Sequence, residues 1–355
     1  MVAAEDAPLP TAVEVPRRRR RAPRWLFGIL ILVILLWCAY WYAAYRVTDS
    51  VIGSAVDGRD PVVACTERAI GGFPFQLRLS CSAASVNGGE GAAFSIGPLA
   101  VAAALYNPTR INATIAAPLA LDTPTFQLDA TWDEADSTVA VGFSGVSSVE
   151  AAFEDVSVAV ADGIGFPLWG VTADRWTTRI EPAPERDDAL RAWLSTEALV
   201  VDLGGSLYPS LSGTATLTLM DTGGTLNADP AATARNWLRT GGSFHIDASR
   251  LTSGTVVAEI TGPLVLELDG TFSGEVTVRY RGEEDLPMLI SALFPGYANQ
   301  ADIIAEAIVV LSKTIEMEGQ PAYEAKLILR HGAVNVGLIP ILTIPSLGSL
   351  EGFLE

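Results

Sequence analysis

The sequence predicts a mainly β protein of the α+β kind, with one N-terminal transmembrane helix followed by an extended curved antiparallel β-sheet and a few short packing helices. Two observations predict this architecture. Residues 25–45 are an uncharged run between Arg24 and Arg46. From about residue 75 onward, short segments that alternate apolar and polar residues recur between Gly, Pro, Asn and Asp. Such alternation is typical of half-buried strands, and short connections favour antiparallel pairing.

The uncharged run has the length of one membrane crossing. Its 21 residues reach roughly 31 Å as a helix, close to the thickness of the hydrocarbon layer. Basic flanks mark the cytoplasmic side of a spanning helix, and here they precede it: Arg17, Arg18, Arg19, Arg20, Arg21 and Arg24. Aromatic residues that would anchor the helix at the two interfaces are Trp25, Trp37, Trp41 and Tyr45. The N-terminus is therefore predicted to be cytoplasmic.

Two processing alternatives compete with a retained helix. A cleaved signal peptide needs a shorter apolar region and small residues at two positions before the cut, and Tyr42-Ala43-Ala44 supplies half of that pattern. A lipid-modified cysteine needs a small residue before it, whereas Trp37 precedes Cys38. We therefore expect an anchor whose replacement by a cleavable signal releases a folded, soluble domain.

Beyond the anchor, the elements are predicted from periodicity and caps. Val47–Ile70 is expected to continue as helix up to Gly71-Gly72, and a strand is expected over residues 75–79. Further strands are expected at residues 111–115, 126–132, 138–143, 214–219, 256–260, 264–268, 274–280, 323–329 and 333–336. Helices are expected at residues 185–199, 229–238, 286–293 and 300–312. Residues 338–345 contain two prolines and are expected to cross a sheet edge or to close one end of the sheet.

The last predicted helix carries an apolar stripe that includes Ile303, Ile304, Ile308 and Leu311. Such a stripe is either core or a face for an apolar ligand or a partner. The domain organisation is predicted as a disordered basic tail at 1–24, the transmembrane helix at 25–45, and two halves of a periplasmic β domain at 46–160 and 161–355. The boundary between the halves rests on the similarity of Gly71–Phe75 to Gly163–Leu168.

The charge and the cysteines limit which partners and which compartment fit the domain. The chain has 23 basic and 41 acidic residues; the first 46 residues hold 7 and 3 of them, so the remainder holds 16 and 38, a net charge of −22. This surface disfavours nucleic acid and close approach to an anionic membrane. In an oxidising compartment Cys65 and Cys81 are expected to form a disulfide; two buried thiols are the alternative.

The sequence offers no recognisable catalytic or cofactor site. The histidines, His245 and His331, have no metal-ligand spacing around them, so neither a metal nor another cofactor is expected. No Ser has the two flanking glycines of a nucleophile elbow, and neither Lys313 nor Lys326 follows a Gly-rich phosphate loop. We predict a protein that is not an enzyme; a hydrolase with an unrecognised site is the remaining enzymatic alternative.

Two sets of residues carry a resemblance to known families. Gly72–Leu79 (GFPFQLRL) with Cys81 after it, and Leu327–Gly332 leading to Gly337–Pro340, resemble an uncharacterised alphaproteobacterial family, the domain of unknown function numbered 2125. The tail is also similar to AsmA-like proteins, which implies inner-membrane-anchored periplasmic proteins with curved sheets and apolar grooves that act in envelope lipid homeostasis. The chain is far shorter than members that bridge two membranes. The family supplies no catalytic residues to carry over.

The leading hypothesis is a non-enzymatic protein of the bacterial inner membrane whose periplasmic β domain binds a lipid or another apolar ligand in a groove and acts in envelope maintenance. Burying an acyl chain contributes about 0.8 kcal/mol per methylene group. The competing interpretation of the same apolar residues is an ordinary core. The alternative function is a structural or interaction module that holds an envelope protein partner through a sheet edge or the Ile303–Ile308 helix face.

Overall fold

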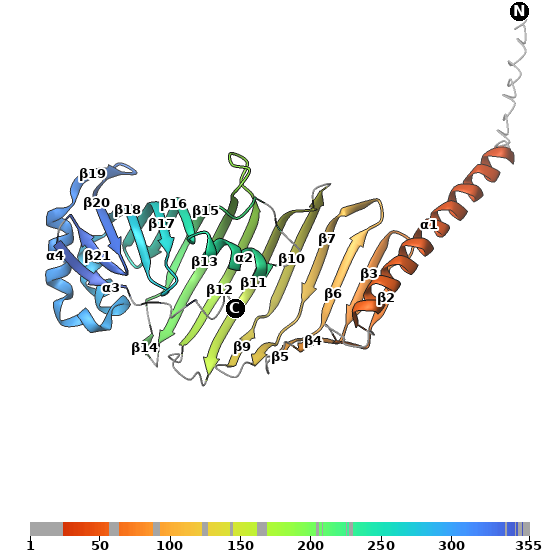
Figure 1. Cartoon of the computed structure of the whole chain (residues 1–355), viewed down its shortest axis with the longest axis horizontal. Helices are drawn as coiled ribbons and strands as arrows, with labels where there is room; N and C mark the ends of the chain where they lie inside the picture. The colour runs from red at the N-terminus through yellow and green to blue at the C-terminus, as the bar shows by residue number, and fades with distance from the viewer. Residues whose placement is uncertain are drawn as a thin grey trace, which may run out of the picture.

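The computed structural model describes residues 24–56, 64–87, 93–122, 127–142, 145–161, 169–203, 206–207, 209–224, 226, 230–337, 339–344, 346 and 350. Figure 1 shows one long sheet with the N-terminal helix leaving one end and a pair of helices at the other. The helices are α1 (Arg24–Val56), α2 (Pro230–Arg239), α3 (Leu286–Leu293) and α4 (Ala301–Leu311), with 3-10 turns η2 (Glu283–Asp285) and η3 (Pro295–Gln300). The predicted fold class is confirmed.

The strands pair antiparallel into a single sheet. In the N-terminal part they are β1 (Ala64–Thr66), β2 (Ala69–Gly71), β3 (Gln76–Cys81), β4 (Ala83–Asn87), β5 (Ala93–Ile96), β6 (Leu99–Ala104), β7 (Asn107–Ile115), β8 (Leu119–Asp122), β9 (Gln127–Thr131), β10 (Glu134–Gly142) and β11 (Gly145–Ala161). They continue as β12 (Trp169–Pro182), β13 (Leu190–Leu203), β14 (Ser206–Leu207), β15 (Leu211–Leu219), β16 (Ser243–Ser253), β17 (Val256–Leu266), β18 (Phe272–Arg281), β19 (Lys313–Met317), β20 (Gln320–Arg330), β21 (Ala333–Val336) and β22 (Ile339–Thr343).

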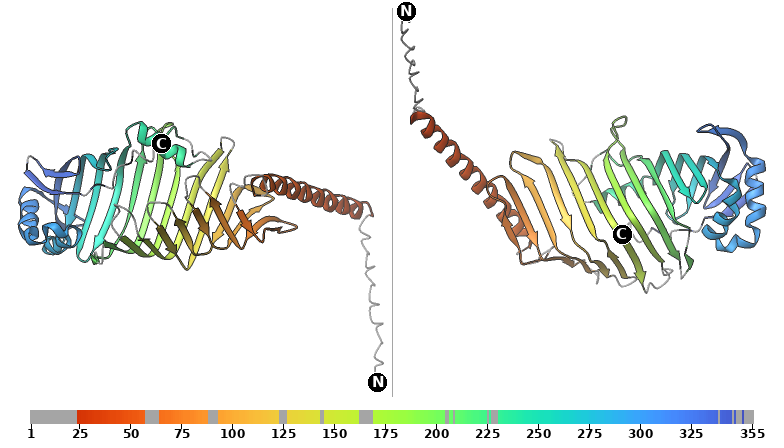
Figure 2. Two further views of the ribbon diagram at one scale, coloured as in Figure 1. Left: turned by 60° about the horizontal axis from the view of Figure 1, so that its bottom comes forward. Right: turned by 180° about the vertical axis from the view of Figure 1, so that it is seen from behind.

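A crease runs across the N-terminal strands and divides the sheet into two walls. Each of five long segments is interrupted once, and paired segments break at neighbouring positions: Glu67-Arg68, Ser82, Gly97-Pro98, Ala116–Pro118 and Trp132-Asp133. On one side lie β2, β3, β6, β7 and β10, which we call the first wall. On the other lie β1, β4, β5, β8 and β9, the second wall. The two rows of strands run in different directions in Figure 2.

Strand β11 belongs to both walls, because its first part pairs with β10 and its last part with β9. The first wall continues through the paired segments of β12, β13, β15 and β16, and the second wall through the other ends of β12 and β13. The crease continues through β11 at Asp155 and through β13 at Ala198, which have left-handed φ angles of 51° and 52°. At Ala198 the register between β13 and β15 shifts by one residue, and such a bulge bends a strand and strengthens its twist. The long strands β11 and β13 thus continue across the crease where β9 and β10 are separate elements.

Replacing Ala198 by glycine is expected to stabilise the protein by about 0.5–1 kcal/mol, because the left-handed conformation costs residues that have a Cβ about 1–2 kcal/mol and glycine loses more entropy on folding. Urea unfolding in detergent micelles measures this difference. The matched control is Ala192→Gly in the same strand, where the backbone is not left-handed. Equal losses of stability in Ala198→Gly and Ala192→Gly would contradict the expectation that the backbone is strained at Ala198.

The C-terminal part of the sheet is covered by helices on one face. Leu286 and Ile290 of α3 pack with Ile304 of α4 against Tyr280 of β18 and Ala325 of β20. Helices α2, α3 and α4 confirm three of the four predicted helices. The proline-containing end forms β22, which pairs with β21 and lies at the edge, as predicted.

Two predicted helical segments are strands. Residues 185–199 were expected to be helical, but residues 190–203 form β13 between β12 and β15. Leu190 and Leu194 fit both the helical period and strand alternation, and pairing along both edges of β13 decides for the strand. The extension of α1 also ends at Val56, and residues 64–71 form β1 and β2 instead of helix. The division at residue 160 stays a prediction, since β11 and β12 pair across it.

Candidate functional site: an apolar trough

Cross-strand register separates the first wall into an apolar and a polar face. Antiparallel partners point to the same face, so a row of partners describes the surface across the sheet. One row runs from β3 to β16 as Leu77, Ala103, Ile111, Val139, Val149, Ile180, Ala192, Leu217 and Ile246. The adjacent row on the other face is Arg78, Ala102, Asn112, Thr138, Glu150, Arg179, Trp193, Thr216 and Ala248.

The second wall shows the same separation. Its apolar row, from β4 to β13, is Ala84, Ile96, Leu119, Ala130, Val158, Val171 and Val201. The neighbouring row on the opposite face contains the small or polar residues Ser85, Ser95, Ala120, Asp129, Ala159, Gly170 and Asp202. Both walls therefore have one continuous apolar surface.

The two apolar surfaces face each other across the crease. Trp132 and Val156 are buried there, and the partly buried Leu119 and Leu128 from the second wall and Phe153 from the first pack against them. The Trp132 indole N–H donates to the Ile115 carbonyl over 2.8 Å, which satisfies its polar group within this cluster. Packing from both sides places the apolar rows on the concave side of the bend. The folded sheet is thus a trough with an apolar interior.

The interior of the trough is only half-buried away from the crease. Leu77, Ile111, Val139, Ile180 and Leu217 all keep an intermediate fraction of their surface exposed. In a closed core between two layers these side chains would be fully buried. The sequence left open whether the alternating apolar residues form a core or a groove, and their exposure favours a groove.

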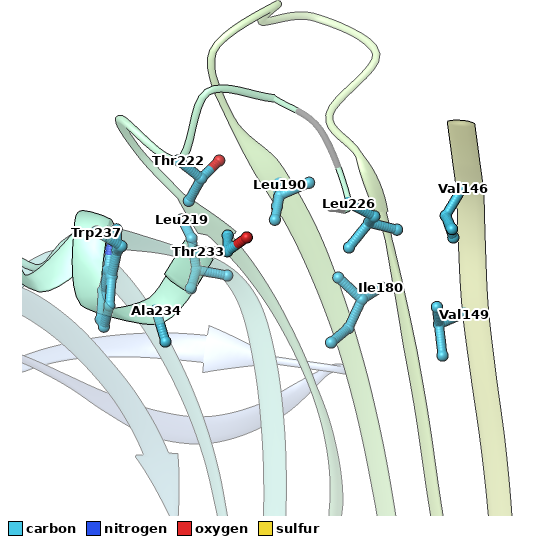
Figure 3. Close-up of a pocket in the computed structure, with 10 residues that line it drawn as sticks. All are labelled: Val146, Val149, Ile180, Leu190, Leu219, Thr222, Leu226, Thr233, Ala234 and Trp237. Carbon is cyan, nitrogen blue, oxygen red and sulfur yellow. The ribbon is translucent and has the colours of Figure 1, made fainter. Parts of the chain in front are cut away.

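A cavity of about 390 Å³ lies in the trough where α2 crosses it (Figure 3). Its lining comes from the inner face of four long strands, from α2 and from the segment before α2: Val146, Val149, Ile180, Leu190, Leu219, Thr222, Leu226, Thr233, Ala234 and Trp237. The volume lies in the range of small-molecule sites. Eight of these ten residues lack a hydroxyl or charged group, so the cavity suits an apolar ligand.

Local sequence holds α2 over the strands. The Trp237 indole N–H donates to the Ser243 carbonyl over 3.0 Å, and the Thr222 hydroxyl donates to the Asp188 carbonyl over 3.2 Å. Gly224 has a φ of 63°, and a Cβ there would lie 1.8 Å from the Asp187 carbonyl oxygen. Only glycine allows this close approach. The polar groups of the cavity wall that carry these bonds are thereby turned toward the protein.

The end of the trough far from α1 is closed by α3 and α4. The Tyr280 hydroxyl lies 3.1 Å from the Ser312 Oγ, and burial raises the pKa of Tyr280. Because α3 and α4 pack on β18 and β20, the apolar face of the sheet forms an ordinary core at this end. Of the residues predicted as a ligand or partner face, Ile304 is buried and Ile308 packs against the core, whereas Ile303 is 70% exposed and Leu311 41%. The four residues do not share one surface.

The outer face of the sheet is solvated and carries ion pairs. Arg175 pairs with Glu154 at 2.7 Å, Arg250 with Glu318 at 2.8 Å, and Arg279 with Glu324 at 2.9 Å. The hydrogen bond that Arg250 donates lowers the pKa of Glu318, and the bond that Arg175 donates to Glu154 raises the pKa of Arg175. Exposed pairs of this kind contribute little to stability.

Neither histidine lies in the trough. His245 contacts Asp247 over 3.1 Å, and His331 is in the turn before β21, 4.0 Å from Asp269. Among the described residues, no group of three or more His, Cys, Asp or Glu side chains is placed to hold a metal ion.

The predicted disulfide is present, and it lies beside the crease. Cys65 of β1 is bonded to Cys81 at the end of β3, with the two Cα atoms 5.5 Å apart. It therefore connects the second wall to the first at the end near α1. Cys38, in α1, is free.

The predicted anchor residues lie along α1, which contains a stretch, Phe27–Ser50, long and apolar enough to cross a membrane. Trp25 is 63% exposed and Tyr45 stacks on Trp41 at 5.6 Å between ring centroids. Arg17–Arg21 lie outside the described residues, and of Arg24 only the backbone position at the start of α1 is described. Trp37 and Trp41 also bond to the β domain: their indole N–H groups donate to Pro74 in the loop before β3 and to Gln76, the first residue of β3.

Fold and site together define a folded open β-sheet protein with an apolar trough and an N-terminal helix that is long enough to span a membrane. Residues 41–345 match the family described as uncharacterized protein conserved in bacteria, DUF2125, and the chain belongs to this family. The sequence resemblance to that family is confirmed. No curated protein and no solved structure matches the chain. The AsmA-like similarity stays a prediction.

Proposed function

We propose that this protein is a non-enzymatic component of the bacterial inner membrane that binds the acyl chain of a lipid in the trough and serves envelope maintenance. The observation that carries the proposal is the unbroken apolar row across nine strands, half-buried on the concave side of a folded sheet. Such a surface costs free energy in water and is stabilised by an apolar ligand.

The shape of the trough favours a long, thin ligand. The cavity under α2 is continuous in lining with the apolar rows, since Val149 and Ile180 belong to both. Each methylene group that leaves water contributes about 0.8 kcal/mol, so the affinity of an acyl chain increases with the length that lies in the trough. The helix α1 keeps the opening of the trough near a membrane, with the sheet in the periplasm and the N-terminus in the cytoplasm.

The direct test is native mass spectrometry of the full chain, extracted from bacterial membranes in a mild detergent. We expect a bound lipid that survives detergent exchange and is identified after organic extraction. Protein that is ligand-free, and that takes up no lipid from vesicles of phosphatidylethanolamine and phosphatidylglycerol, contradicts the proposal.

A second candidate function rests on an exposed apolar surface at the other end of the molecule. Met288, Ile303 and Val310 are 60%, 70% and 73% exposed on α3 and α4. An apolar surface of this kind fits a protein partner in the envelope. A photo-cross-linking amino acid at Ile303 would trap one defined partner in cells, with Lys326, which is exposed on the face of β20 opposite to α3 and α4, as the control position; the absence of a specific adduct contradicts this function.

A further inference from the structure

Three exposed aromatic side chains lie beside the middle of α1. Phe73 and Phe75 belong to the loop before β3, and Tyr106 to the turn before β7; they are 56%, 60% and 74% exposed. Trp41 contacts the Phe73 ring edge to face at 5.3 Å, and Trp37 lies 6.4 Å from the Phe75 ring. Large aromatic residues concentrated at one edge are costly in water and favourable at a membrane interface.

The backbone carbonyl groups in and next to this loop are hydrogen-bonded within the protein, as an apolar environment requires. The Pro74 carbonyl accepts from the Trp37 indole N–H over 2.8 Å, and the Gln76 carbonyl from the Trp41 indole N–H over 2.9 Å. The carbonyls of Gly72 and Phe75 accept from backbone amides, both over 3.0 Å. Non-helical backbone is tolerated in the apolar part of a membrane only where its polar groups are bonded within the protein.

The position of the loop along α1 places it at membrane depth. Arg46 is the first charged residue after the apolar run, and Trp41 and Trp37 precede it by five and nine residues. At about 1.5 Å per residue, the two indoles lie about 8 and 13 Å from Arg46 along the helix. A cavity of about 590 Å³ with an apolar lining extends from Phe73, Phe75 and Tyr106 to Val33 in the apolar run.

Charge at this edge also fits a membrane surface. From Glu67 to Asp122 the sequence has three arginines, Arg68, Arg78 and Arg110, and three acidic residues, Glu67, Glu90 and Asp122, so this stretch has no net charge. Arg78 and Arg110 are exposed, and Arg68 pairs with Asp49 of α1 at 3.4 Å. The strongly acidic character of the rest of the domain is therefore absent where the sheet meets α1, and basic side chains attract anionic lipid head groups.

We propose that the edge formed by Phe73, Phe75 and Tyr106 is inserted into the lipid bilayer beside α1, and that an acyl chain of the leaflet fills the cavity between this edge and the helix. The inference rests on membrane anchoring by α1, which is part of the proposed function. The trough then meets the bilayer directly, because β3 and β6, which follow and precede these aromatic residues, form its first strands.

The test measures collision of spin labels with oxygen, which partitions into lipid, and with a nickel chelate, which stays in water. The full chain carries Cys38→Ala, keeps the Cys65–Cys81 bond and is embedded, one copy each, in nanodiscs of palmitoyl-oleoyl phosphatidylcholine. A single label at Ile31→Cys reports on the membrane-spanning part of α1, and labels at Phe75→Cys and Tyr106→Cys report on the aromatic edge. A label at Leu268→Cys is the control, an exposed apolar position away from that edge.

We expect oxygen to relax the labels at residues 31, 75 and 106 several-fold more than the chelate does, and the label at 268 to behave in the opposite way. Lipid exposure at 31 with water exposure at 75 and 106 overturns membrane docking and leaves the anchor intact. Water exposure at 31 overturns the anchor and the docking with it. Labels at 75 and 106 that neither reagent reaches are covered by protein, which also overturns the proposal.

Discussion

Replacing Ile180 by aspartate is expected to lower the lipid occupancy of the purified protein a hundredfold or more. Ile180 lies in the middle of the apolar row of the first wall and in the lining of the cavity under α2. An unpaired carboxylate beside an acyl chain costs several kcal/mol, and about 1.4 kcal/mol corresponds to a tenfold change in affinity. Native mass spectrometry of the full chain in detergent measures the occupancy.

Two further variants separate loss of binding from loss of folding. Thr177→Asp places the same charge on the same strand but on the polar face, where Thr177 is the partner of Ala152 and Ser195. It should retain the lipid. Ile180→Trp fills the cavity without adding charge and should lower occupancy while a calorimetric unfolding transition persists. Retention of lipid by a folded Ile180→Asp variant, or its equal loss from Thr177→Asp, contradicts binding in the trough.

Removing the disulfide is expected to lower the free energy of unfolding by about 3 kcal/mol, the chain-entropy value for a loop of this length. The bond joins Cys65 and Cys81 at the junction of the two walls, so its loss should also loosen the end of the sheet near α1. Urea unfolding of Cys65→Ala/Cys81→Ala in detergent measures the first effect and amide exchange in β1–β3 the second.

The matched control for the disulfide is Cys38→Ala, which removes the free cysteine of α1 and leaves the bond intact. That variant should unfold like the parent protein, and exchange in β16–β18 should be unchanged in both. A double variant as stable as the parent would show that the disulfide is not needed to hold the two walls together.

The sequence predicted the composition of the fold well, because its signals are local. The uncharged run between Arg24 and Arg46, the alternation in β7, β15 and β18, and the proline at the start of α2 each specify their own element. The helix predicted over residues 185–199 was wrong because the prediction used local signals only. The leucines in this segment fit both the helical and the strand period, and pairing with β12 and β15 stabilises the strand.

A groove could be proposed from the sequence, but which residues form it could not, because the crease depends on alignment between strands. Gly97-Pro98 and Ala116–Pro118 each look like an ordinary turn, and only the pairing of β5 with β8 and of β6 with β7 brings them onto one crease. Likewise, Trp37 was visible as an interfacial aromatic residue, but its bond to Pro74 joins residues 37 positions apart. Whether the apolar residues of an alternating strand form a core or a groove depends on what packs against them. Periodicity within one segment does not predict that.

Photo-cross-linking in living bacteria tests the central claim most directly. A photoreactive amino acid placed at Ile111, Val139 or Leu217 faces the trough, whereas one at the adjacent residues Asn112, Thr138 or Thr216 faces the solvated side. Lipid is labelled with radioactive phosphate, and adducts are separated by electrophoresis. Lipid binding in the trough predicts labelled protein from the three inner positions and none from the outer ones. Equal labelling of both faces, or no lipid adduct at any inner position, contradicts it.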